Sequence, residues 1–470
     1  MHPSEPSNPA PTPGSFANLS LREELHKSLA SLLYTAMTPI QEKSVPLILN
    51  NDDIIAQAKT GSGKTASFAL GLLNNLKIEF FGAQALILCP TRELADQVCQ
   101  AIRKLACFMP NVKILNLSGG IPMKPQSDSL RHGAHIIVGT PGRILKHLNK
   151  ETLNLAKIKT LVLDEADRML DMGFLDDIKT IISACPKQRQ TLLFSATYPD
   201  EIKQLAKQFM IHPKEIYVEV TDIELDIEQR FYEITKGNKF PLLKSLLLHF
   251  KPSSALIFCN TKQATVDVTD LLVHAGFSAL ALNGNMEQID RDLAVLRFAN
   301  RSCSFLVATD VAARGLDIKE LPAVINYDLA FEQDVHVHRI GRTGRAGNKG
   351  LALNITTLAD AQRLCAIEDQ LKRPIQWSTG DELTSTDTKE LTPEMITLCL
   401  AAGKKDKIRP GDILGALTKD AGLAGDVIGK IDITPFNSYV AIHRSQADKA
   451  LRYLQDGKLK GRKINARKIS

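Results

Sequence analysis

The sequence contains no apolar run that approaches eighteen residues, although 44% of its residues are hydrophobic. A membrane-spanning helix needs about twenty, so we expect no membrane partner. It also lacks a Cys-X-X-Cys pair, and its eight scattered cysteines have no spacing typical of a zinc site, which indicates reduced core residues of a cytoplasmic protein. The first fifteen residues contain five prolines but no basic stretch followed by an apolar one. We therefore predict a disordered tail over residues 1–15 rather than a signal peptide.

Positive charge is concentrated at one end of the chain. The 470 residues have a net charge of +6, yet residues 403–470 alone contain fifteen Lys and Arg, seven Asp and no Glu. The preceding part is therefore slightly acidic. A local excess of this kind is attracted to a phosphate backbone through counterion release, so nucleic acid is the predicted partner of this end. Taken alone, the same pattern is equally typical of a solvated surface.

The length predicts two or three domains, because one hydrophobic core rarely serves so long a chain. Short runs rich in Val, Ile and Leu alternate with helix-length amphipathic stretches, which predicts parallel sheets covered by helices. The strands expected in the first half lie at residues 54–56, 85–88, 136–138, 161–163 and 191–194. Those expected in the second half lie at residues 255–258, 305–308, 323–326 and 351–355. The predicted parts are an α/β domain over residues 16–220, a second over 227–377, a linker over 378–392 and a C-terminal domain over 393–470.

A glycine-rich loop follows the first predicted strand. Residues 58–65 read Ala-Lys-Thr-Gly-Ser-Gly-Lys-Thr, and an apolar helical pattern begins directly after them. Gly61 and Gly63 allow backbone amides to point at phosphate oxygens, while Lys64 can reach the β and γ phosphates and Thr65 can coordinate Mg²⁺. The alternative is a chance glycine-rich turn, but the strand-loop-helix order favours a nucleoside triphosphate site. The predicted nucleotide-binding residues of this loop are Ala58, Thr60, Gly61, Ser62, Gly63, Lys64 and Thr65.

An acidic cluster, Asp-Glu-Ala-Asp at residues 164–167, follows another buried strand. Ligands of α/β folds bind at the carboxyl ends of strands, so this cluster is a candidate for the second half of the site. Asp164 would hold Mg²⁺ largely through water, and Glu165 would orient and deprotonate the attacking water. In isolation, such a cluster is more often a helix N-cap.

With the loop and this cluster in place, the sequence resembles the DEAD-box RNA helicases through both predicted α/β domains. The resemblance implies that both domains are RecA-like. Residues 33–41 look like the family's adenine-reading motif, with Gln41 as the hydrogen-bonding residue, Tyr34 beside it and Phe16 as the upstream aromatic residue. The resemblance therefore implies that the nucleotide is ATP. Leu33 stands where the family commonly has Gly.

Further segments resemble the family's RNA-contacting motifs. The residues that they supply are Thr91, Arg92, Gly120, Thr140 and Arg143 in the first domain and Thr261, Gly284 and Thr309 in the second. Hydroxyl groups, amides beside Gly and Arg side chains bind phosphate without reading bases, so we expect a surface indifferent to RNA sequence. Taken singly, each segment is a plain turn or helix start. Asn283 replaces the family's usual His.

The resemblance also implies residues that link hydrolysis to RNA. The coupling residues would be Ser195, Thr197 and His338, and Asp317 would lie near the ribose. Arg342 and Arg345 are three residues apart, so one helical turn can project both guanidinium groups the same way. Two such arginines are usually solvated. Because a complete ATP site precedes them in the sequence, we interpret them as arginine fingers. Closure of the second domain over ATP would then make hydrolysis depend on RNA, and the resemblance implies local strand separation.

Residues 395–468 predict the order strand, helix, strand, strand, helix, strand, which is typical of an RRM-like α+β fold. The usual aromatic stacking motif is missing, because Tyr439 is the one aromatic residue of the third strand. We therefore expect RNA contacts from basic residues, which are Lys404, Lys405, Lys407, Arg409, Lys458, Lys460, Arg462 and Lys463. The segment 403–412 and the motor sequence together resemble the bacterial DbpA subfamily. This implies an anchor on a hairpin of large-subunit, 23S-type ribosomal RNA and a role of the monomer on the pre-50S particle.

Three alternatives stay open. The basic domain could raise general RNA affinity without selecting a site. The motor could be an RNA clamp that uses ATP only to stay closed, although intact Glu165, Arg342 and Arg345 favour turnover. It could also be a DNA motor, which the family's recognition of the 2′-hydroxyl opposes.

Overall fold

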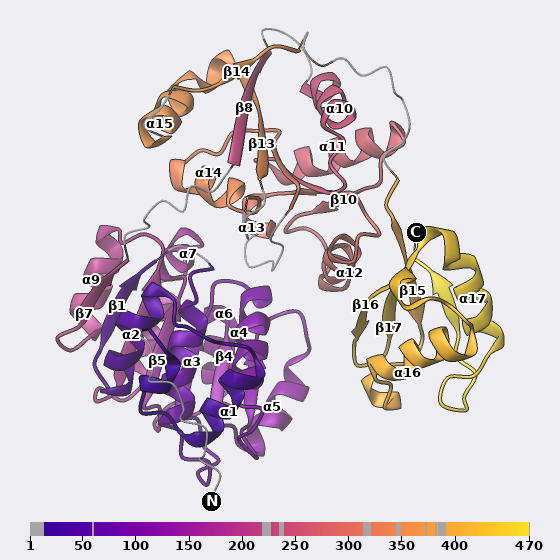
Figure 1. Cartoon of the computed structure of the whole chain (residues 1–470). Helices are drawn as coiled ribbons and strands as arrows, with labels where there is room; N and C mark the ends of the chain where they lie inside the picture. The colour runs from indigo at the N-terminus through magenta and orange to yellow at the C-terminus, as the bar shows by residue number, and fades with distance from the viewer. Residues whose placement is uncertain are drawn as a thin grey trace, which may run out of the picture. The chain divides into compact units, whose positions relative to one another are not determined.

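The computed structural model describes residues 14–58, 61–218, 227–234, 239–313, 321–344, 349–371, 374–380, 383 and 392–469. The chain forms two compact units, residues 1–221 and 222–470 (Figure 1). Most of the predicted tail and most of the predicted linker lie outside the described residues, and the predicted domain boundaries stay predictions.

The first unit contains a seven-stranded parallel sheet with the order β3-β4-β2-β5-β6-β1-β7. Its strands are β1 (Ile54–Gln57), β2 (Ala85–Leu88), β3 (Ile114–Leu117), β4 (Ile136–Gly139), β5 (Thr160–Asp164), β6 (Gln190–Ser195) and β7 (Lys214–Tyr217). Because successive residues of a strand face opposite sides, apolar runs here serve two cores. Ile54 and Ala56 belong to one core, and Ile55 belongs to the other.

Helices cover both faces of this sheet (Figure 1). The helices of one core are α1 (Glu23–Ser31), α2 (Pro39–Leu49), α3 (Lys64–Asn74) and α4 (Arg92–Leu105). The other face is covered by α6 (Pro141–Asn149), α7 (Ala166–Asp171), α8 (Leu175–Ser183) and α9 (Asp200–Phe209). The short helix α5 (Met123–Arg131) follows β3. The helices α3, α4, α5, α6, α7 and α9 each follow the carboxyl end of a strand, so the loops that join these strands and helices gather at one edge of the sheet.

The second unit contains another seven-stranded parallel sheet, with the order β10-β11-β9-β12-β13-β8-β14. Its strands are β8 (Ile227–Ile234), β9 (Ala255–Phe258), β10 (Ala279–Leu282), β11 (Phe305–Ala308), β12 (Ala323–Asn326), β13 (Gly350–Thr357) and β14 (Trp377–Ser378). Its helices are α10 (Lys239–Phe250), α11 (Lys262–His274), α12 (Gln288–Ala299), α13 (Asp310–Ala313), α14 (Gln333–Ile340) and α15 (Ala361–Leu371). The two predicted RecA-like sheets are thereby confirmed.

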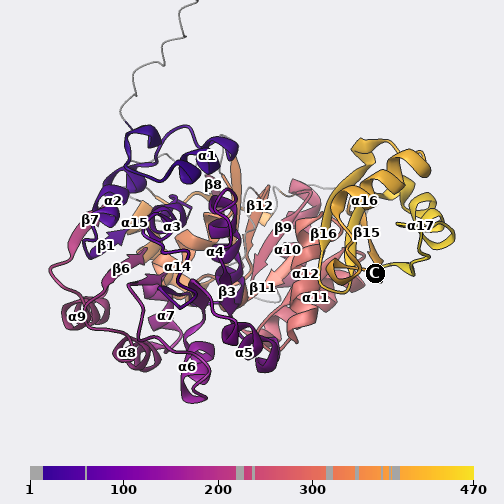
Figure 2. The same ribbon diagram turned by 90° about the horizontal axis from the view of Figure 1, so that it is seen from below.

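Residues 392–469 form a four-stranded antiparallel sheet with the order β16-β17-β15-β18. Its elements are β15 (Met395–Leu400), α16 (Pro410–Gly415), β16 (Ile428–Ile433), β17 (Ser438–His443), α17 (Ala447–Asp456) and β18 (Ala466–Lys468). Both helices cover the same face of the sheet (Figure 2). The predicted RRM-like order is confirmed, although the last strand is shorter than expected and leaves Lys463 in the preceding loop.

Six of the eight cysteines are buried, but Cys107 and Cys365 are exposed. The expectation that the cysteines are core residues is wrong for these two. Among the described helices, none combines the length and the apolar character needed to cross a membrane.

Candidate nucleotide and RNA-binding site

The loop between β1 and α3 is shaped by two glycines. Gly61 and Gly63 both have positive φ angles, +87° and +97°. The conformation of Gly63 favours glycine, and a Cβ atom there would lie 2.4 Å from Nε2 of Gln41 and would displace that amide. Lys64 begins α3 and is buried, and its Nζ donates a hydrogen bond of 2.8 Å to the carbonyl oxygen of Ala58. Thr60 lies outside the described residues.

The adenine-motif residues contact this loop directly. Gln41 is buried in α2, where its Nε2 donates to the carbonyl oxygen of Gly63 at 3.2 Å and its Oε1 accepts from the amide of Thr38 at 2.9 Å. The hydroxyl of Thr38 donates to the carbonyl oxygen of Ser62 at 2.7 Å. Thr38 was not among the predicted site residues. The feature that could have revealed it is its position directly before Pro39, the first residue of α2. The base-reading motif and the phosphate loop are therefore one hydrogen-bonded assembly.

The upstream aromatic residues lie beside each other. The rings of Phe16 and Tyr34 stack with 6.1 Å between their centroids, and Phe16 is buried whereas Tyr34 is exposed. Leu33 has a φ angle of 59° and is 82% exposed. A leucine thus occupies the left-handed conformation that a glycine adopts without strain.

The acidic cluster lies at the carboxyl end of β5. Asp164 is buried, and this burial raises its pKa to about 7, partly offset by the charge of Lys64. Glu165 has a left-handed backbone, with φ 52° and ψ 55°, at the N-cap of α7. A divalent cation would return the Asp164 carboxyl group to its charged form, and the Ser62 hydroxyl is buried without a hydrogen-bond partner. These residues therefore fit a nucleotide with Mg²⁺.

Asp167 connects this cluster to the Ser-Ala-Thr segment after β6. Its Oδ2 accepts hydrogen bonds from the amides of Ala196 and Thr197, at 3.2 and 2.9 Å, and from the Thr197 hydroxyl at 3.1 Å. Its amide donates to the Ser195 hydroxyl at 3.2 Å. The structure thus joins both predicted coupling residues of this unit to the nucleotide cluster, through an aspartate to which the sequence analysis gave no role.

The predicted RNA residues of the first unit follow β2, β3 and β4, at the same edge of the sheet. Thr91 caps α4, and Thr140 precedes α6. Arg143 donates to Gln126 at 2.8 Å and to the carbonyl oxygen of Ile121 at 3.0 Å. Burial and the nearby charge of Arg92 lower the pKa of Arg143. The two arginines are therefore close to each other.

Glycines adjoin these arginines. A Cβ atom on Gly119 would lie 2.7 Å from the Arg92 guanidinium group, and Gly120 has a positive φ angle of 84°. At Gly119 the backbone after β3 therefore lies against the Arg92 guanidinium group, which would have to shift to admit another side chain.

In the second unit, the predicted RNA residues follow β9, β10 and β11. The Thr261 hydroxyl accepts from the amide of Ala264 and caps α11, and Thr309 precedes α13. Gly284 lies beside Lys262. Asn283 is buried, where it donates to Thr265 at 2.8 Å and accepts from the amide of Asn285 at 3.0 Å. The asparagine that replaces histidine therefore holds the loop after β10.

Helix α14 carries the arginine motif. Arg339 is 2% exposed, and its guanidinium group bonds both carboxylate oxygens of Asp310, at 2.6 and 2.7 Å, and Asn260 at 2.8 Å. Arg339 is not among the predicted site residues. His338 is partly exposed on α14, and Arg342 follows the helix, with its carbonyl oxygen accepting from the amide of Leu321. Asp317 and Arg345 lie outside the described residues.

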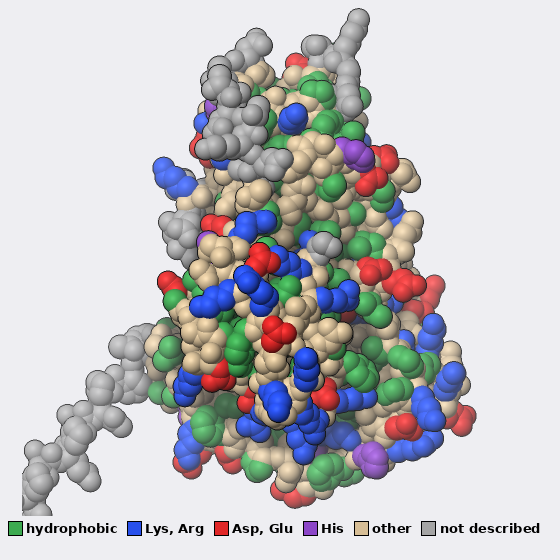
Figure 3. Space-filling view, turned by 90° about the vertical axis from the view of Figure 1, so that its right-hand side faces the viewer, with side chains coloured by type: hydrophobic (Ala, Val, Ile, Leu, Met, Phe, Trp, Pro, Cys, Tyr) green, Lys and Arg blue, Asp and Glu red, His purple; other side chains and the backbone are tan. Residues whose placement is uncertain are grey.

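The eight predicted basic contacts of the C-terminal domain are all exposed. Lys460 donates to the carbonyl oxygen of Lys407 at 2.7 Å and pairs with Asp412 at 2.8 Å. This contact brings the loop before α16 and the loop after α17 together. Lys and Arg side chains cluster near the middle of the face that Figure 3 views.

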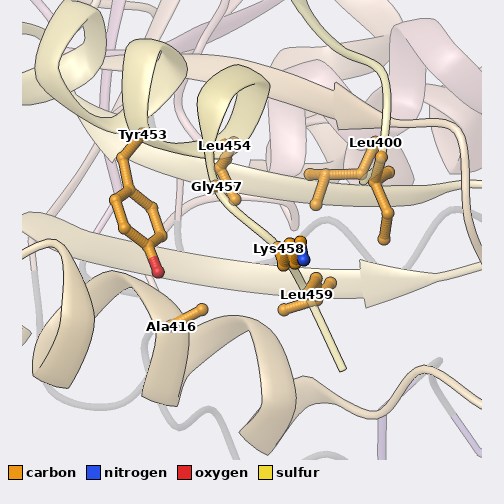
Figure 4. A pocket seen from close by; sticks show the side chains of 8 residues that line it. Leu400, Ala416, Tyr453, Leu454, Gly457, Lys458 and Leu459 are labelled. Carbon is orange, nitrogen blue, oxygen red and sulfur yellow. The ribbon is translucent and has the colours of Figure 1, made fainter. Parts of the chain in front are cut away.

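Two features limit where RNA can bind on this domain. A recess beside Lys458, lined by apolar side chains such as Leu400, Ala416 and Leu459, is too narrow for a ligand (Figure 4). On the other face of the sheet, Thr397 is fully buried and its hydroxyl bonds Asn300 at 2.8 Å and Ser302 at 2.6 Å. This strand position is therefore closed to an RNA base.

Comparisons with known proteins agree with this geometry. Residues 38–205 match the DEAD/DEAH box helicase family, residues 238–347 the helicase conserved C-terminal domain and residues 397–468 the DbpA RNA binding domain. The chain is 52% identical to the ATP-dependent RNA helicase DbpA of Escherichia coli over 94% of its length and 96% of that protein. It is 37% identical to the protein of the same name from Bacillus subtilis, over 97% and 99% of the two chains.

A solved structure gives the same result for the two motor sheets. The structure of S. cerevisiae Dbp5 bound to RNA and ADP BeF3 is similar with a TM-score of 0.72 and 31% identity, over 78% of this chain and 96% of that chain.

Proposed function

We infer that this chain, which belongs to the DEAD-box family of RNA helicases and within it to the DbpA proteins, opens short RNA helices at a site chosen by its C-terminal domain. It is an ATP-dependent RNA helicase. We propose that this site lies on large-subunit, 23S-type ribosomal RNA. We further propose that the chain acts in the cytoplasm, during assembly of the large ribosomal subunit. The observation that carries this assignment is the joined pair of exposed basic loops at Lys407 and Lys460.

The first unit supplies the nucleotide chemistry of the proposal. Lys64, now bonded to a carbonyl oxygen of its own loop, would transfer that hydrogen bond to the β and γ phosphates. Mg²⁺, held by Thr65 and by Asp164 through water, would neutralise phosphate charge. Glu165 would orient and deprotonate the attacking water, because it follows Asp164 at the same strand end.

The second unit supplies the dependence on RNA. Arg342 and Arg345 belong to this unit and the carboxylates to the first, so hydrolysis needs both. A guanidinium group that donates to the γ-phosphoryl group stabilises the charge that develops there, which is worth roughly 10³ to 10⁵ in rate. We therefore propose an enzyme that turns over ATP on RNA, in preference to a clamp that only stays closed.

Phosphate contacts at the strand ends would hold RNA without reading its sequence. Thr91, Arg92 and Arg143 in the first unit and Thr261 and Thr309 in the second offer hydroxyl and guanidinium donors. Selection of a site must then come from elsewhere in the chain, and the exposed basic loops of the C-terminal domain are the candidates. Because their positive charge alone would attract any RNA, the shape of the surrounding loops would select the binding site.

The proposal is tested by steady-state ATP hydrolysis with large-subunit ribosomal RNA and with unrelated RNA of equal length. The intact chain should respond more strongly to the ribosomal RNA. Combined Lys404→Ala, Lys405→Ala and Lys407→Ala substitutions should abolish this preference. The matched control replaces Lys157, Lys159 and Lys187 by Ala, since these lysines are exposed at the opposite edge of the first sheet.

Equal stimulation of the intact chain by both RNAs would contradict the choice of ribosomal RNA, and would leave a helicase with general RNA affinity. Stimulation by single-stranded DNA would contradict the assignment to RNA. Hydrolysis that proceeds equally without nucleic acid would contradict the role of the second unit.

A further inference from the structure

We propose that Phe436 is the base-stacking residue of the C-terminal domain. Its ring would receive one unpaired base of the bound RNA, at the tip of the turn between β16 and β17. The inference rests on the proposed function, because it assumes that this domain binds structured RNA. It adds a contact to an aromatic side chain where the sequence analysis offered only basic ones.

Exposure singles out this ring. Among the described residues of the domain, the Phe and Tyr side chains are Phe436, Tyr439 and Tyr453. Phe436 is 62% exposed, whereas both tyrosines are partly buried. A phenylalanine with more than half of its surface in water contributes little to a core. Because Thr397 on the sheet is buried against Asn300 and Ser302, a base cannot stack there. The most exposed aromatic side chain among the described residues of the domain therefore lies in the loop.

The ring is placed among cations. Nζ of Lys405 lies 4.0 Å from its centroid, which is the geometry of a cation–π contact. Lys404 and Lys407 belong to the same exposed loop as Lys405, and no ion pair is recorded for these three lysines in the described part of the chain. An ammonium group over a ring occupies one of its two faces. The other face is then available to a base, while the lysines bind the adjacent phosphates.

The turn that carries Phe436 is fixed to the basic loop. The amides of Lys404 and Lys405 donate to the carbonyl oxygens of Thr434 and Pro435, at 2.9 and 3.1 Å. Within the turn, the amide and hydroxyl of Thr434 both donate to the carbonyl oxygen of Asn437, each at 2.8 Å. The backbone of the turn that carries the ring is therefore held in place before RNA binds.

Gly403 makes this approach of the two loops possible. A Cβ atom at this position would lie 2.4 Å from the Thr434 carbonyl oxygen and 2.8 Å from the Phe436 carbonyl carbon. Such contacts with backbone atoms cannot be relieved by a side-chain rotation. The sequence thus contains a glycine where the basic loop meets the aromatic turn.

Stacking and charge have different signatures in binding, which gives the test. The dissociation constant of the full chain is measured over a range of salt concentrations, with a large-subunit ribosomal RNA transcript and with a fully paired RNA duplex. Phe436→Ala should weaken binding to the transcript about tenfold without changing the salt slope, because base–aromatic stacking is worth about 1–3 kcal/mol. Binding to the duplex should not change. Lys404→Ala should instead weaken binding to both RNAs and reduce the salt slope by about one.

Two further substitutions separate stacking from apolar contact and from misfolding. Phe436→Tyr should retain transcript binding within about twofold, whereas Phe436→Leu should behave like the alanine variant, since leucine has no π face. Phe80→Ala is the matched control, because Phe80 is an exposed aromatic residue of the first unit. Equal binding by the leucine and wild-type chains would overturn the inference.

Fluorescence observes the stacking directly. The sequence contains one tryptophan, Trp377. In a chain that carries Trp377→Phe and Phe436→Trp, the remaining indole should be quenched when the transcript is added. Tight binding with unchanged emission would overturn the inference and leave the proposed function intact, whereas no preference of the wild-type chain for ribosomal RNA would overturn the proposed function itself.

Discussion

The surroundings of Asp164 oppose the ionisation of its carboxyl group. Burial raises its pKa from 3.8 to about 7 in the nucleotide-free chain. Between these values the folded state keeps a proton that the unfolded state has released, so stability falls as the pH rises through this range and levels off above about 7. One pKa unit corresponds to about 1.4 kcal/mol, which bounds the whole effect at about 4 kcal/mol.

Asp164→Asn should remove this pH dependence, because an amide has no proton to lose. The difference between the thermal midpoints of the variant and the parent should increase from pH 4 to pH 7 in favour of the variant, and then stay constant. Calorimetry at several pH values without nucleotide measures it. A difference that does not vary with pH would show that Asp164 is already ionised in the folded chain.

Leu33 holds a left-handed backbone with an exposed side chain. Leu33→Gly should raise the free energy of unfolding of the first unit by about 0.5–1 kcal/mol, since relief of about 1–2 kcal/mol of strain exceeds the entropy that glycine adds to the unfolded state. Asn51→Gly is the matched control. Asn51 has a φ of 62°, which asparagine tolerates, so this substitution should raise the free energy of unfolding by less. A lower midpoint for Leu33→Gly would contradict the strain.

At the scale of elements, continuous apolar runs predicted the central strands, because strands buried on both faces need apolar residues at every position. The prediction at residues 85–88 has the bounds of β2, and Gln190–Ser195 extends its prediction by one residue at each end. The strands β3, β7, β8, β10 and β14 were missed. β3 contains Asn116, β7 is mostly exposed and β8 alternates, so none of these three forms an unbroken apolar run. β10 does form one, but it is short and its two middle residues are only partly buried.

Arg339 connects three elements of the second unit. It lies on α14 and contacts Asp310 of α13, Asn326 of β12 and Asn260 after β9. The sequence offered an arginine within a motif, but only the fold shows that its five donors are consumed inside the protein. Its role is therefore to position the loops at the strand ends.

Arg339→Lys should destabilise the second unit by about 3 kcal/mol or more, because an ammonium group cannot replace a bidentate buried pair and leaves partners unsatisfied. Urea unfolding followed by fluorescence of Trp377 reports on this unit alone. Arg363→Lys is the control, since the Arg363–Asp360 pair is partly exposed. Equal shifts of the two midpoints would contradict the connecting role.

At the scale of the whole molecule, the motifs could be read from the sequence because each is a short segment at a strand's carboxyl end. Their contacts with one another could not. Thr38 with Ser62, and Asp167 with Thr197, are separated by 24 and 30 residues and meet only through the parallel sheet. The contact between Phe436 and Lys405 likewise could not be predicted from the sequence, because the two residues lie in different loops of the C-terminal domain.

The central claim is that ATP is used to open RNA at a site chosen by the C-terminal domain. Strand displacement tests it most directly, with one short RNA duplex joined either to a large-subunit ribosomal RNA segment or to unrelated RNA of equal length. The intact chain should displace the strand only with ATP and faster on the ribosomal substrate, while Glu165→Gln should bind both substrates without repeated displacement. Equal rates on the two substrates, or displacement that continues in the Glu165→Gln chain, would contradict the account.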